Sequence, residues 1–426
     1  MSVRGGQALK VMVVGGGARE HALVWKITQS PKVDEVYVAP GNAGTQAIAR
    51  NLNIAPTNIK ALAEAAQEYR VDLTVVGPEV PLSSGIVDLF QSLSLPVFGP
   101  TQAATRLESS KVFSKELMQK YGIPCARGEV FYLVSQAKDY VKSHPAPMVI
   151  KADGLAAGKG VTVAASQEKA LEAVSDMMEK KTLGAAGDRV IIEECLSGKE
   201  VSLLAFTDGR TVRPMVSACD YKRAFDGDQG PNTGGMGSYS PPGFFDQSGV
   251  EQVQRTILEP TVRAMAQEGA AYSGVLYAGL MVTSEGMRVM EFNARFGDPE
   301  TQVIVPRLKT DLVDIMLAVI EGKLDTTKIE WSDEACVGVV MASAGYPGSY
   351  KTGFPITGLD KLEEDILVFH AGTKEKNGIV TDGGRVLTVV ARGGTLAEAR
   401  AKVYSNVLRI NFEGCHYRRD IAAGRD

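Results

Sequence analysis

The stretch LKVMVVGGGARE, residues 9–20, decides the fold class of this chain. Leu9–Val14 is a short apolar run that ends at three consecutive glycines, and a helical pattern begins at about Glu20. A buried strand that turns through glycines into a helix is typical of the start of a βαβ unit. The free backbone N–H groups at the start of such a helix are suited to binding an anion.

The alternation of strand and helix signals continues through the first hundred residues. Strand patterns cover residues 35–39, 71–76 and 96–98, and helical patterns cover residues 58–70 and 83–93. This order predicts an α/β fold with an N-terminal doubly wound, Rossmann-like parallel sheet. Ligands of such sheets bind at the carboxyl ends of the strands, which here carry residues 15–20, 40–45 and 77–82.

The rest of the chain predicts two further units, which agrees with about three domains at roughly 150 residues each. We expect helices over residues 111–121, 168–180, 250–267 and 312–321, and strands over residues 148–152, 161–164, 189–194, 201–207, 212–218, 275–282 and 287–292. A Gly/Pro-rich loop is expected over residues 226–243. After a polar stretch at 325–333, a strand-rich C-terminal unit is expected over residues 335–343, 366–370 and 386–390, with a closing helix over residues 396–408.

Composition narrows the function classes. The 426 residues include 46 Lys plus Arg and 50 Asp plus Glu, a net charge of −4, which argues against nucleic acid as the main partner. No apolar run approaches the roughly 18 residues of a membrane span, and the five cysteines are scattered. We therefore expect a soluble, cytoplasmic protein with reduced thiols and no membrane partner. The 45 glycines exceed the roughly 30 of average usage, and phosphate-binding loops are one use for them.

The first glycine loop matches a dinucleotide fingerprint only in part. Glu20 stands where the third glycine belongs, and the second strand ends in Pro40, Gly41 and Asn42 without the acid that would hold an adenosine ribose. A smaller phosphorylated ligand is the preferred interpretation. A tight structural turn remains the alternative.

A second glycine loop, DGLAAGKG at residues 153–160, is superficially similar to a P-loop. Only three residues separate Gly154 from Gly158, Gly160 stands where Ser or Thr is required, and the loop joins two strands instead of entering a helix. We interpret it as a mobile lid that closes over a polyphosphate, with Lys151 reaching a phosphate from the preceding strand.

The segment MEFNARFGDPE, residues 290–300, combines metal-binding and anion-binding side chains. Glu291 and Asn293 point to the same face of a strand, and two hard oxygen ligands suit Mg²⁺. Arg295, two residues further on, could stabilise charge on a transferred phosphoryl group.

Two weaker segments complete the set. The strand at residues 190–194 runs into a linker with Leu196 and Glu200, which could pair with an adenine edge and a ribose. The loop GPNTGGMG, residues 230–237, follows Asp220 and Lys222, and its backbone amides could approach a small anion. A flexible connector is the alternative for this loop.

Taken in order, these segments resemble the ATP-grasp ligases, and most closely the glycinamide ribonucleotide synthetase family. The resemblance rests on the strings PGNAGT at 40–45, GPEVPL at 77–82, KADGLAAGKGV at 151–161, GPNTGGMG at 230–237 and RFGDPETQ at 295–302, and it extends from about Leu9 to Asp420. It implies an N-terminal substrate-binding domain at 1–102, an ATP-grasp α+β core at 103–328 with a lid subdomain at about 123–194, and a C-terminal domain at 329–426.

The resemblance also implies an activity and residue roles. The family joins glycine to 5-phosphoribosylamine through glycyl phosphate with ATP and Mg²⁺ or Mn²⁺, the second step of purine synthesis. The catalytic residues would be Lys151, Arg295 and Asp220, and the metal ligands Glu291 and Asn293. ATP would bind Lys111, Lys151, Gly158, Lys159, Gly160, Glu193, Glu194, Leu196 and Glu200. The other substrates would bind Gly16, Gly17, Arg19, Glu20, Gly41, Asn42, Ala43, Glu79, Asp220, Lys222, Gly234, Gly235 and Arg295. The enzyme would act on small molecules as a monomer or homodimer.

One departure and three alternatives stay open. Many ATP-grasp ligases carry a further metal carboxylate on the preceding strand, but residues 275–282 contain no acid, so a two-metal site is less secure. A carboxylating ATP-grasp subunit would need a biotinyl-lysine region, which we do not find. A nicotinamide dehydrogenase would rest on the 15–20 loop alone. A non-catalytic nucleotide-sensing module would not need Lys151, Glu291 and Arg295 together.

Overall fold

A computed structural model of the chain describes residues 8–155 and 160–424, and the N-terminal part is the expected doubly wound sheet. Its five strands are all parallel in the order β3-β2-β1-β4-β5. The strands are β1 (Leu9–Gly15), β2 (Val33–Pro40), β3 (Arg50–Asn51), β4 (Leu73–Val76) and β5 (Val97–Phe98). The connecting helices are α1 (Ala18–Ile27), α2 (Ala43–Ile48), α3 (Ile59–Glu68), α4 (Glu79–Ser83) and α5 (Ile86–Ser92). The helix predicted around residues 83–93 is present as α5, which starts later because Gly85 adopts φ +84° at its N-cap, whereas the short α4 before it was not predicted.

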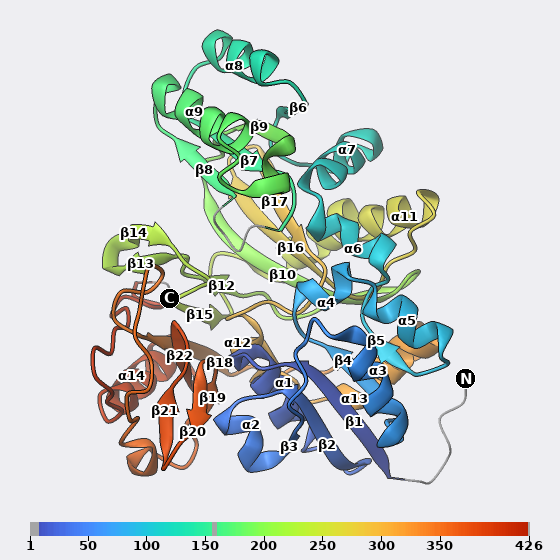
Figure 1. Ribbon diagram of the computed structural model, residues 1–426, viewed down its shortest axis with the longest axis vertical. Coiled ribbons are helices and arrows are strands. Elements are labelled where there is room, and N and C mark those ends of the chain that lie inside the picture. The colour runs from blue at the N-terminus through green and yellow to red at the C-terminus, as the bar shows by residue number, and fades with distance from the viewer. Residues whose placement is uncertain (1–7, 156–159, 425–426) are drawn as a thin grey trace.

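The central part contains two antiparallel four-stranded sheets. The first has the order β6-β9-β7-β8, with strands β6 (Gly128–Phe131), β9 (Val190–Glu194), β7 (Met148–Ala152) and β8 (Val161–Ala164). Helices α8 (Val134–Ser143) and α9 (Gln167–Val174) cover it at the top of Figure 1. Two of its elements, β6 and α8, were not predicted, because residues 128–143 are mostly polar or half-exposed. The predicted helix over 168–180 ends as α9 at Val174 and continues as a π-turn over Ser175–Glu179.

The second central sheet has the order β11-β10-β16-β17. Its strands are β11 (Val212–Pro214), β10 (Lys199–Asp208), β16 (Ser273–Thr283) and β17 (Gly286–Asn293). Around it lie α6 (Gln102–Ser109), α7 (Lys111–Tyr121), α10 (Gln247–Val253), α11 (Glu259–Gln267) and α13 (Leu312–Glu321). Eight of the eleven β16 residues are buried, as expected for a strand that is covered on both faces.

The C-terminal sheet takes two strands from the preceding part of the chain. Its order is β12-β15-β18-β22-β19, with β12 (Cys219–Asp220), β15 (Gly237–Ser240), β18 (Ala335–Ala342), β22 (Arg385–Gly393) and β19 (Leu367–His370). Helix α14 (Leu396–Val407) packs against β18 and β22, and α12 (Thr301–Ile304) lies near β15. The smaller ladders are β13 (Arg223–Phe225) with β14 (Gln229–Asn232), and β20 (Thr373–Glu375) with β21 (Ile379–Thr381).

The predicted loop over residues 226–243 is therefore wrong at 229–232 and 237–240. All four residues of β15 are buried and pair with β18, almost a hundred positions away. The Gly/Pro-rich composition indicates turns, and only the distant partner strand makes this stretch a strand. The expected fold class, a parallel α/β unit followed by an ATP-grasp-like core and a strand-rich end, is otherwise confirmed (Figure 1). Within the described ranges, no helix has both the length and the apolar character needed to cross a bilayer.

Two buried histidines join the first and last parts of the chain. His21 on α1 accepts a hydrogen bond at Nδ1 from the backbone N–H of His370 on β19, at 2.8 Å. Burial, helped by the charge of His370, lowers the pKa of His21 to about 3, and burial lowers the pKa of His370 to about 4. Both histidines are therefore neutral in the folded protein at neutral pH.

This pair predicts acid sensitivity of the folded state. In the unfolded chain a histidine takes up a proton near pH 6.5, so between about pH 6.5 and 4 the unfolded state binds more protons and stability falls as the pH falls. At pH 5 the loss amounts to about 2 kcal/mol for each histidine. We expect the thermal midpoint to drop from pH 7 to pH 5, and to drop less in His21→Gln. The exposed His144, changed to Gln, is the matched control. An equal drop in His21→Gln and in the unaltered chain would contradict the assignment.

Candidate active site

The largest concentration of charged side chains lines a cavity of about 730 Å³ between the two central sheets. Strands β7 and β9 contribute one side, and β10, β17 and residues 219–223 contribute the other. Fourteen of the residues predicted from the sequence line this cavity: Glu79, Lys111, Lys151, Gly160, Glu193, Glu194, Leu196, Glu200, Asp220, Lys222, Gly234, Glu291, Asn293 and Arg295. The structure thus brings together side chains from segments spread over more than two hundred residues.

A buried carboxylate holds two lysines at one end of the cavity. Glu193 on β9 pairs through one oxygen with Lys151 on β7, at 2.6 Å, and through the other with Lys115 on α7, at 3.0 Å. Lys115 is 1% exposed and Glu193 is 6% exposed, so the charges are compensated inside the protein. Lys151 also donates to the Met290 carbonyl oxygen, which ties β7 to β17.

The start of the glycine loop is anchored to α7. Lys111 donates to the Gly154 carbonyl oxygen at 2.9 Å, and the backbone N–H of Val112 donates to Asp153. Arg189 pairs with the same aspartate. Burial lowers the pKa of Lys111, although nearby carboxylates oppose this effect. Two residues predicted to bind ATP, Gly158 and Lys159, lie outside the described residues.

Glu291 and Asn293 present a carboxylate and an amide oxygen to the same cavity. Burial opposes ionisation of Glu291, but the charges of Lys222, Lys151, Lys111 and Arg295 together lower its pKa below the ordinary value. An ionised carboxylate beside an amide oxygen fits a hard divalent cation such as Mg²⁺. In residues 8–155 and 160–424, no group of three His, Cys, Asp or Glu side chains could hold a metal without other ligands. A cation here would therefore need oxygen atoms from a substrate as well.

The pKa of Asp220 is shifted in the opposite direction from that of Glu291. Burial raises its pKa to about 7, with Glu300, Glu200 and Glu291 adding to the effect and Lys222 opposing it. Lys222 lies 3.9 Å from Asp220 and donates to Glu200 at 2.8 Å, and these carboxylates raise the pKa of the lysine despite burial. Asp220 can therefore exchange a proton near neutral pH, which suits a general base.

Arg295 is clamped between two glutamates. Its Nε lies 3.1 Å from Glu79 on α4, and its Nη2 lies 3.0 Å from Glu108 on α6. Glu108 also accepts from the backbone N–H of Ala294 at 2.7 Å, although burial raises its pKa. The fork geometry fixes the guanidinium in the cavity wall.

Eight other residues predicted to bind the substrates lie outside this cavity's lining: Gly16, Gly17, Arg19, Glu20, Gly41, Asn42 and Ala43 around the first glycine loop, and Gly235 in the 230–237 loop. Glu20 accepts hydrogen bonds from the Gly17 N–H at 2.7 Å and from Arg19 at 2.5 Å. Asn42 caps α2 and donates to the carbonyl oxygens of Gly16 and His370. These side chains are engaged in holding the loop itself. The loop nevertheless reaches the site, because Arg19 donates to the Phe296 carbonyl oxygen.

Several residues of the site were not predicted. Lys115 follows Lys111 by four positions on one helix, and this spacing could have indicated that both lie on the same helix face. Glu108, Tyr277 and Glu300 gave no local signal. Glu300 is 2% exposed and accepts hydrogen bonds from Tyr277 at 2.6 Å and from Ser202 at 3.2 Å, a network formed only by folding.

Comparisons with protein families cover most of the chain. Residues 9–108 match the phosphoribosylglycinamide synthetase N domain, residues 109–301 match the phosphoribosylglycinamide synthetase ATP-grasp (A) domain, and residues 336–424 match the phosphoribosylglycinamide synthetase C domain.

Individual relatives agree with these matches. A phosphoribosylamine–glycine ligase from Halalkalibacterium halodurans is 52% identical over 416 residues, which are 97% of each chain. The crystal structure of a phosphoribosylamine–glycine ligase from Thermotoga maritima is 37% identical with a TM-score of 0.85, and the match covers 97% of this chain and 100% of that one. A biotin carboxylase from Campylobacter jejuni has a TM-score of 0.75 at 16% identity, covering 97% of this chain and 94% of that one. This last likeness concerns the fold alone.

The burial of Lys115 predicts that substitutions of two lysines on α7 differ in their effect on the stability of the protein. Removing one partner of a buried ion pair costs about 3 kcal/mol or more, whereas an exposed pair contributes about 1 kcal/mol or less. We expect Lys115→Met to lower the thermal midpoint by about 3 °C or more. Lys120→Met is the control, because Lys120 lies on the same helix but is 63% exposed and pairs with Glu268 at the end of α11. Equal shifts of the midpoint in the two variants, measured by scanning fluorimetry, would contradict the compensated cluster.

Proposed function

The chain belongs to the phosphoribosylglycinamide synthetase family, and we propose that it uses ATP to join glycine to 5-phosphoribosylamine, releasing glycinamide ribonucleotide, ADP and phosphate. The observation that carries this proposal is the meeting of Lys111, Lys151 and Arg295 with Glu291 and Asn293 in one cavity. Several fixed cations next to a pair of hard oxygens suit the binding and transfer of a phosphoryl group. ATP-grasp enzymes use ATP and divalent metal ions.

Glu291 and Asn293 would hold Mg²⁺ or Mn²⁺ together with phosphate oxygens. The bound cation would neutralise charge on the phosphates. Residues 275–282 contain no acid, and the described residues contain no group of three His, Cys, Asp or Glu side chains that could hold a metal ion; both observations support a site completed by the nucleotide.

The nucleotide contacts follow from the position of each group on the cavity wall. Lys111, Lys151 and Gly160 would contact phosphates, Glu194 and Leu196 would flank adenine, and Glu200 would accept from ribose hydroxyls. Gly158 and Lys159 keep their proposed role as ATP-binding residues, outside the described ranges. The ion pairs of Glu193 support a refined role for this residue: its carboxylate orients Lys151, in addition to facing the adenine.

The first step needs no protein nucleophile. An oxygen of the glycine carboxylate attacks the γ-phosphorus, the bond from that phosphorus to the bridging oxygen breaks, and ADP leaves with the bond electrons. Lys151 and Arg295 would stabilise charge on the transferred group, and the clamp by Glu79 and Glu108 supports a fixed position for Arg295. Closure of the loop at 153–160 would protect glycyl phosphate from water.

In the second step, the amine of phosphoribosylamine attacks the carbonyl carbon of glycyl phosphate. The carbon–oxygen bond to phosphate breaks, and the nitrogen gives up one proton. Asp220, with a pKa of about 7, is proposed as the base that accepts it. The phosphorylated sugar would bind toward residues 16–20, 41–43, Glu79, Lys222 and 234–235. The donation from Arg19 to Phe296 supports this, because it holds the loop against the segment that carries Arg295.

We further propose that the enzyme acts as a monomer or as a homodimer. The functional units proposed are residues 1–102, 103–328 with a lid at about 123–194, and 329–426. The C-terminal unit would support the site through the ion pair between Arg385 and Asp298, at 2.8 Å.

Reconstitution tests the function directly. The purified chain is incubated with ATP, Mg²⁺, glycine and freshly generated phosphoribosylamine, and the amide product is detected by mass. Omitting any one substrate should abolish the product. Turnover of ATP that depends on bicarbonate and not on glycine would instead indicate a carboxylating enzyme. That is the function named for the structural neighbour from Campylobacter jejuni.

Removal of the proposed metal ligand should abolish ligation without unfolding the chain. We expect Glu291→Ala to reduce amide formation to below about a tenth of the unaltered rate, because phosphate charge then lacks its counter-ion. Glu285→Ala, in the exposed turn between β16 and β17, should retain the full rate. Glu291→Ala activity above a tenth would show that the metal assignment is wrong.

The proposed base predicts a pH profile. Since Asp220 must be ionised to accept a proton, kcat/KM for phosphoribosylamine should fall about tenfold per pH unit below pH 7. Asp220→Asn should lower kcat/KM and remove this acidic limb, whereas Asp139→Asn, on exposed α8, should retain both. An unchanged acidic limb in Asp220→Asn would assign the limb to another group.

A further inference from the structure

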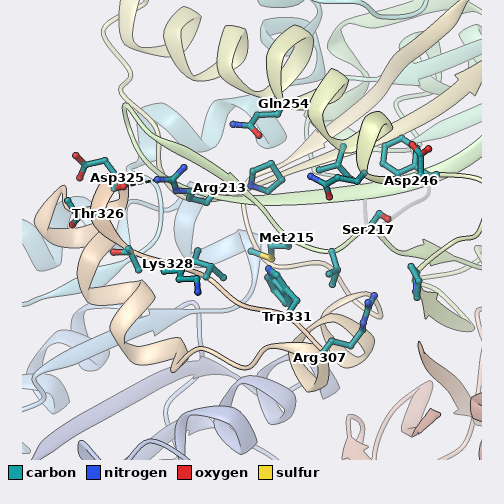
Figure 2. Close-up of a pocket in the computed structure, with 18 residues that line it drawn as sticks. Arg213, Met215, Ser217, Asp246, Gln254, Arg307, Asp325, Thr326, Lys328 and Trp331 are labelled. Carbon is teal, nitrogen blue, oxygen red and sulfur yellow. Dashed lines mark hydrogen bonds between the residues drawn. The ribbon is translucent and has the colours of Figure 1, made fainter. Parts of the chain in front are cut away.

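A second cavity, of about 690 Å³, lies away from the proposed active site. It is bounded by β11, the residues that follow it, the start of α10 and the linker at 325–331 (Figure 2). None of its lining residues also lines the active-site cavity. Nothing in the proposed reaction uses it.

One wall of this second cavity contains a buried guanidinium without a carboxylate partner. Arg307 is 5% exposed, and its Nη1 and Nη2 donate to Ser240 Oγ at 2.6 Å and to the Ser332 carbonyl oxygen at 3.1 Å. Its Nε is buried and has no hydrogen-bond partner among the described residues. Burial lowers the pKa of Arg307, and Asp333 and Glu334 offset only part of this effect. Glu334 forms its ion pair with Arg392 instead, at 3.2 Å.

The other charged groups of the cavity leave Arg307 uncompensated. Figure 2 shows Arg213 and Asp325 at the end opposite Arg307. Arg213 donates to the Asp325 carbonyl oxygen at 2.7 Å, and the Asp325 carboxylate also lines that end. Lys328 pairs with Glu330, and Asp246 caps the N-terminus of α10. None of these groups forms an ion pair with Arg307, whose Nη atoms donate only to neutral oxygens.

Between the two ends the wall is apolar and includes an aromatic ring. Met215 and Trp331 lie in the middle of the cavity in Figure 2, and Phe245, Val250 and Ile329 add apolar surface. The indole of Trp331 offers a flat face for a ring, while a guanidinium offers paired donors for an oxyanion.

We propose that this cavity binds a small molecule that carries a carboxylate or phosphate on a flat apolar body, with the oxyanion on Arg307 and the ring against Trp331. Such an oxyanion would supply the negative charge that no ion pair provides to Arg307, through the Nη groups of the guanidinium. Arginine is suited to this task because one planar group can donate two parallel hydrogen bonds.

The two tryptophans of the chain, Trp25 and Trp331, give an experiment with an internal control. The full chain is labelled with 5-fluorotryptophan, the two fluorine resonances are assigned with Trp25→Phe, and benzoate, phenyl phosphate and neutral benzamide are titrated. We expect the oxyanions to produce a saturable shift of the Trp331 resonance and no shift of the Trp25 resonance, with benzamide at least tenfold weaker. The tighter of the two oxyanions identifies the natural ligand as a carboxylate or a phosphate monoester. Equal binding of benzamide, or no saturable shift with either oxyanion, would overturn the proposal.

Variants at the two ends of the cavity locate the oxyanion. Arg307→Gln should weaken benzoate about tenfold or more, whereas Arg213→Gln, at the balanced end, should change its affinity less than about threefold. If Arg307→Gln does not fold, Arg307→Lys replaces it in the test. This variant keeps the positive charge but loses the paired donors. It should bind benzoate weakly and still prefer benzoate to benzamide. Unchanged benzoate affinity in a folded Arg307 variant, or a larger loss in Arg213→Gln, would contradict the proposed orientation.

Discussion

The arrangement of the molecule depends on the short segment 295–298, which follows β17 and is held by all three parts of the chain. Arg295 pairs with Glu79 from the N-terminal part and with Glu108 from α6. Phe296 packs near Phe98 and Phe206, and its carbonyl oxygen accepts from Arg19. Asp298 pairs with Arg385 from the C-terminal sheet. Because the partners come from separate parts of the chain, a shift of one part relative to another would break an ion pair, and these contacts fix the cavity wall.

The charged groups of the cavity are stabilised mainly by neighbouring charges of the protein and less by solvent. Burial opposes ionisation of both Glu291 and Asp220. Four neighbouring cations nevertheless lower the pKa of Glu291, whereas burial and three carboxylates raise the pKa of Asp220 to about 7 although Lys222 opposes them. The same environment therefore produces two carboxylates with different protonation states. Such a separation of pKa values allows one to act as a ligand and the other to act as a base.

Local patterns were sufficient for most of the regular structure and for much of the site. The helices at Lys111–Tyr121 and Leu312–Glu321 lie at their predicted bounds, because apolar spacing and a following glycine act within a few residues. Strand β15 and the ion pairs of Glu193 could not be predicted, since each depends on groups that folding brings from elsewhere in the chain. The motifs indicated which side chains meet in the cavity, but not which of them pair with one another.

Part of the surplus of glycine has a structural cause that does not depend on a ligand. A Cβ on Gly16 would lie 2.6 Å from the Gly41 carbonyl oxygen, and a Cβ on Gly77 would lie 2.1 Å from the Glu20 carboxylate. Gly15 adopts φ +126° beside the same glutamate. These glycines are needed for the ends of β1, β2 and β4 to approach one another around Glu20, whatever ligand is present. That close approach in turn positions Arg19 to reach Phe296, so glycine at the edge of the parallel sheet supports the segment that carries Arg295.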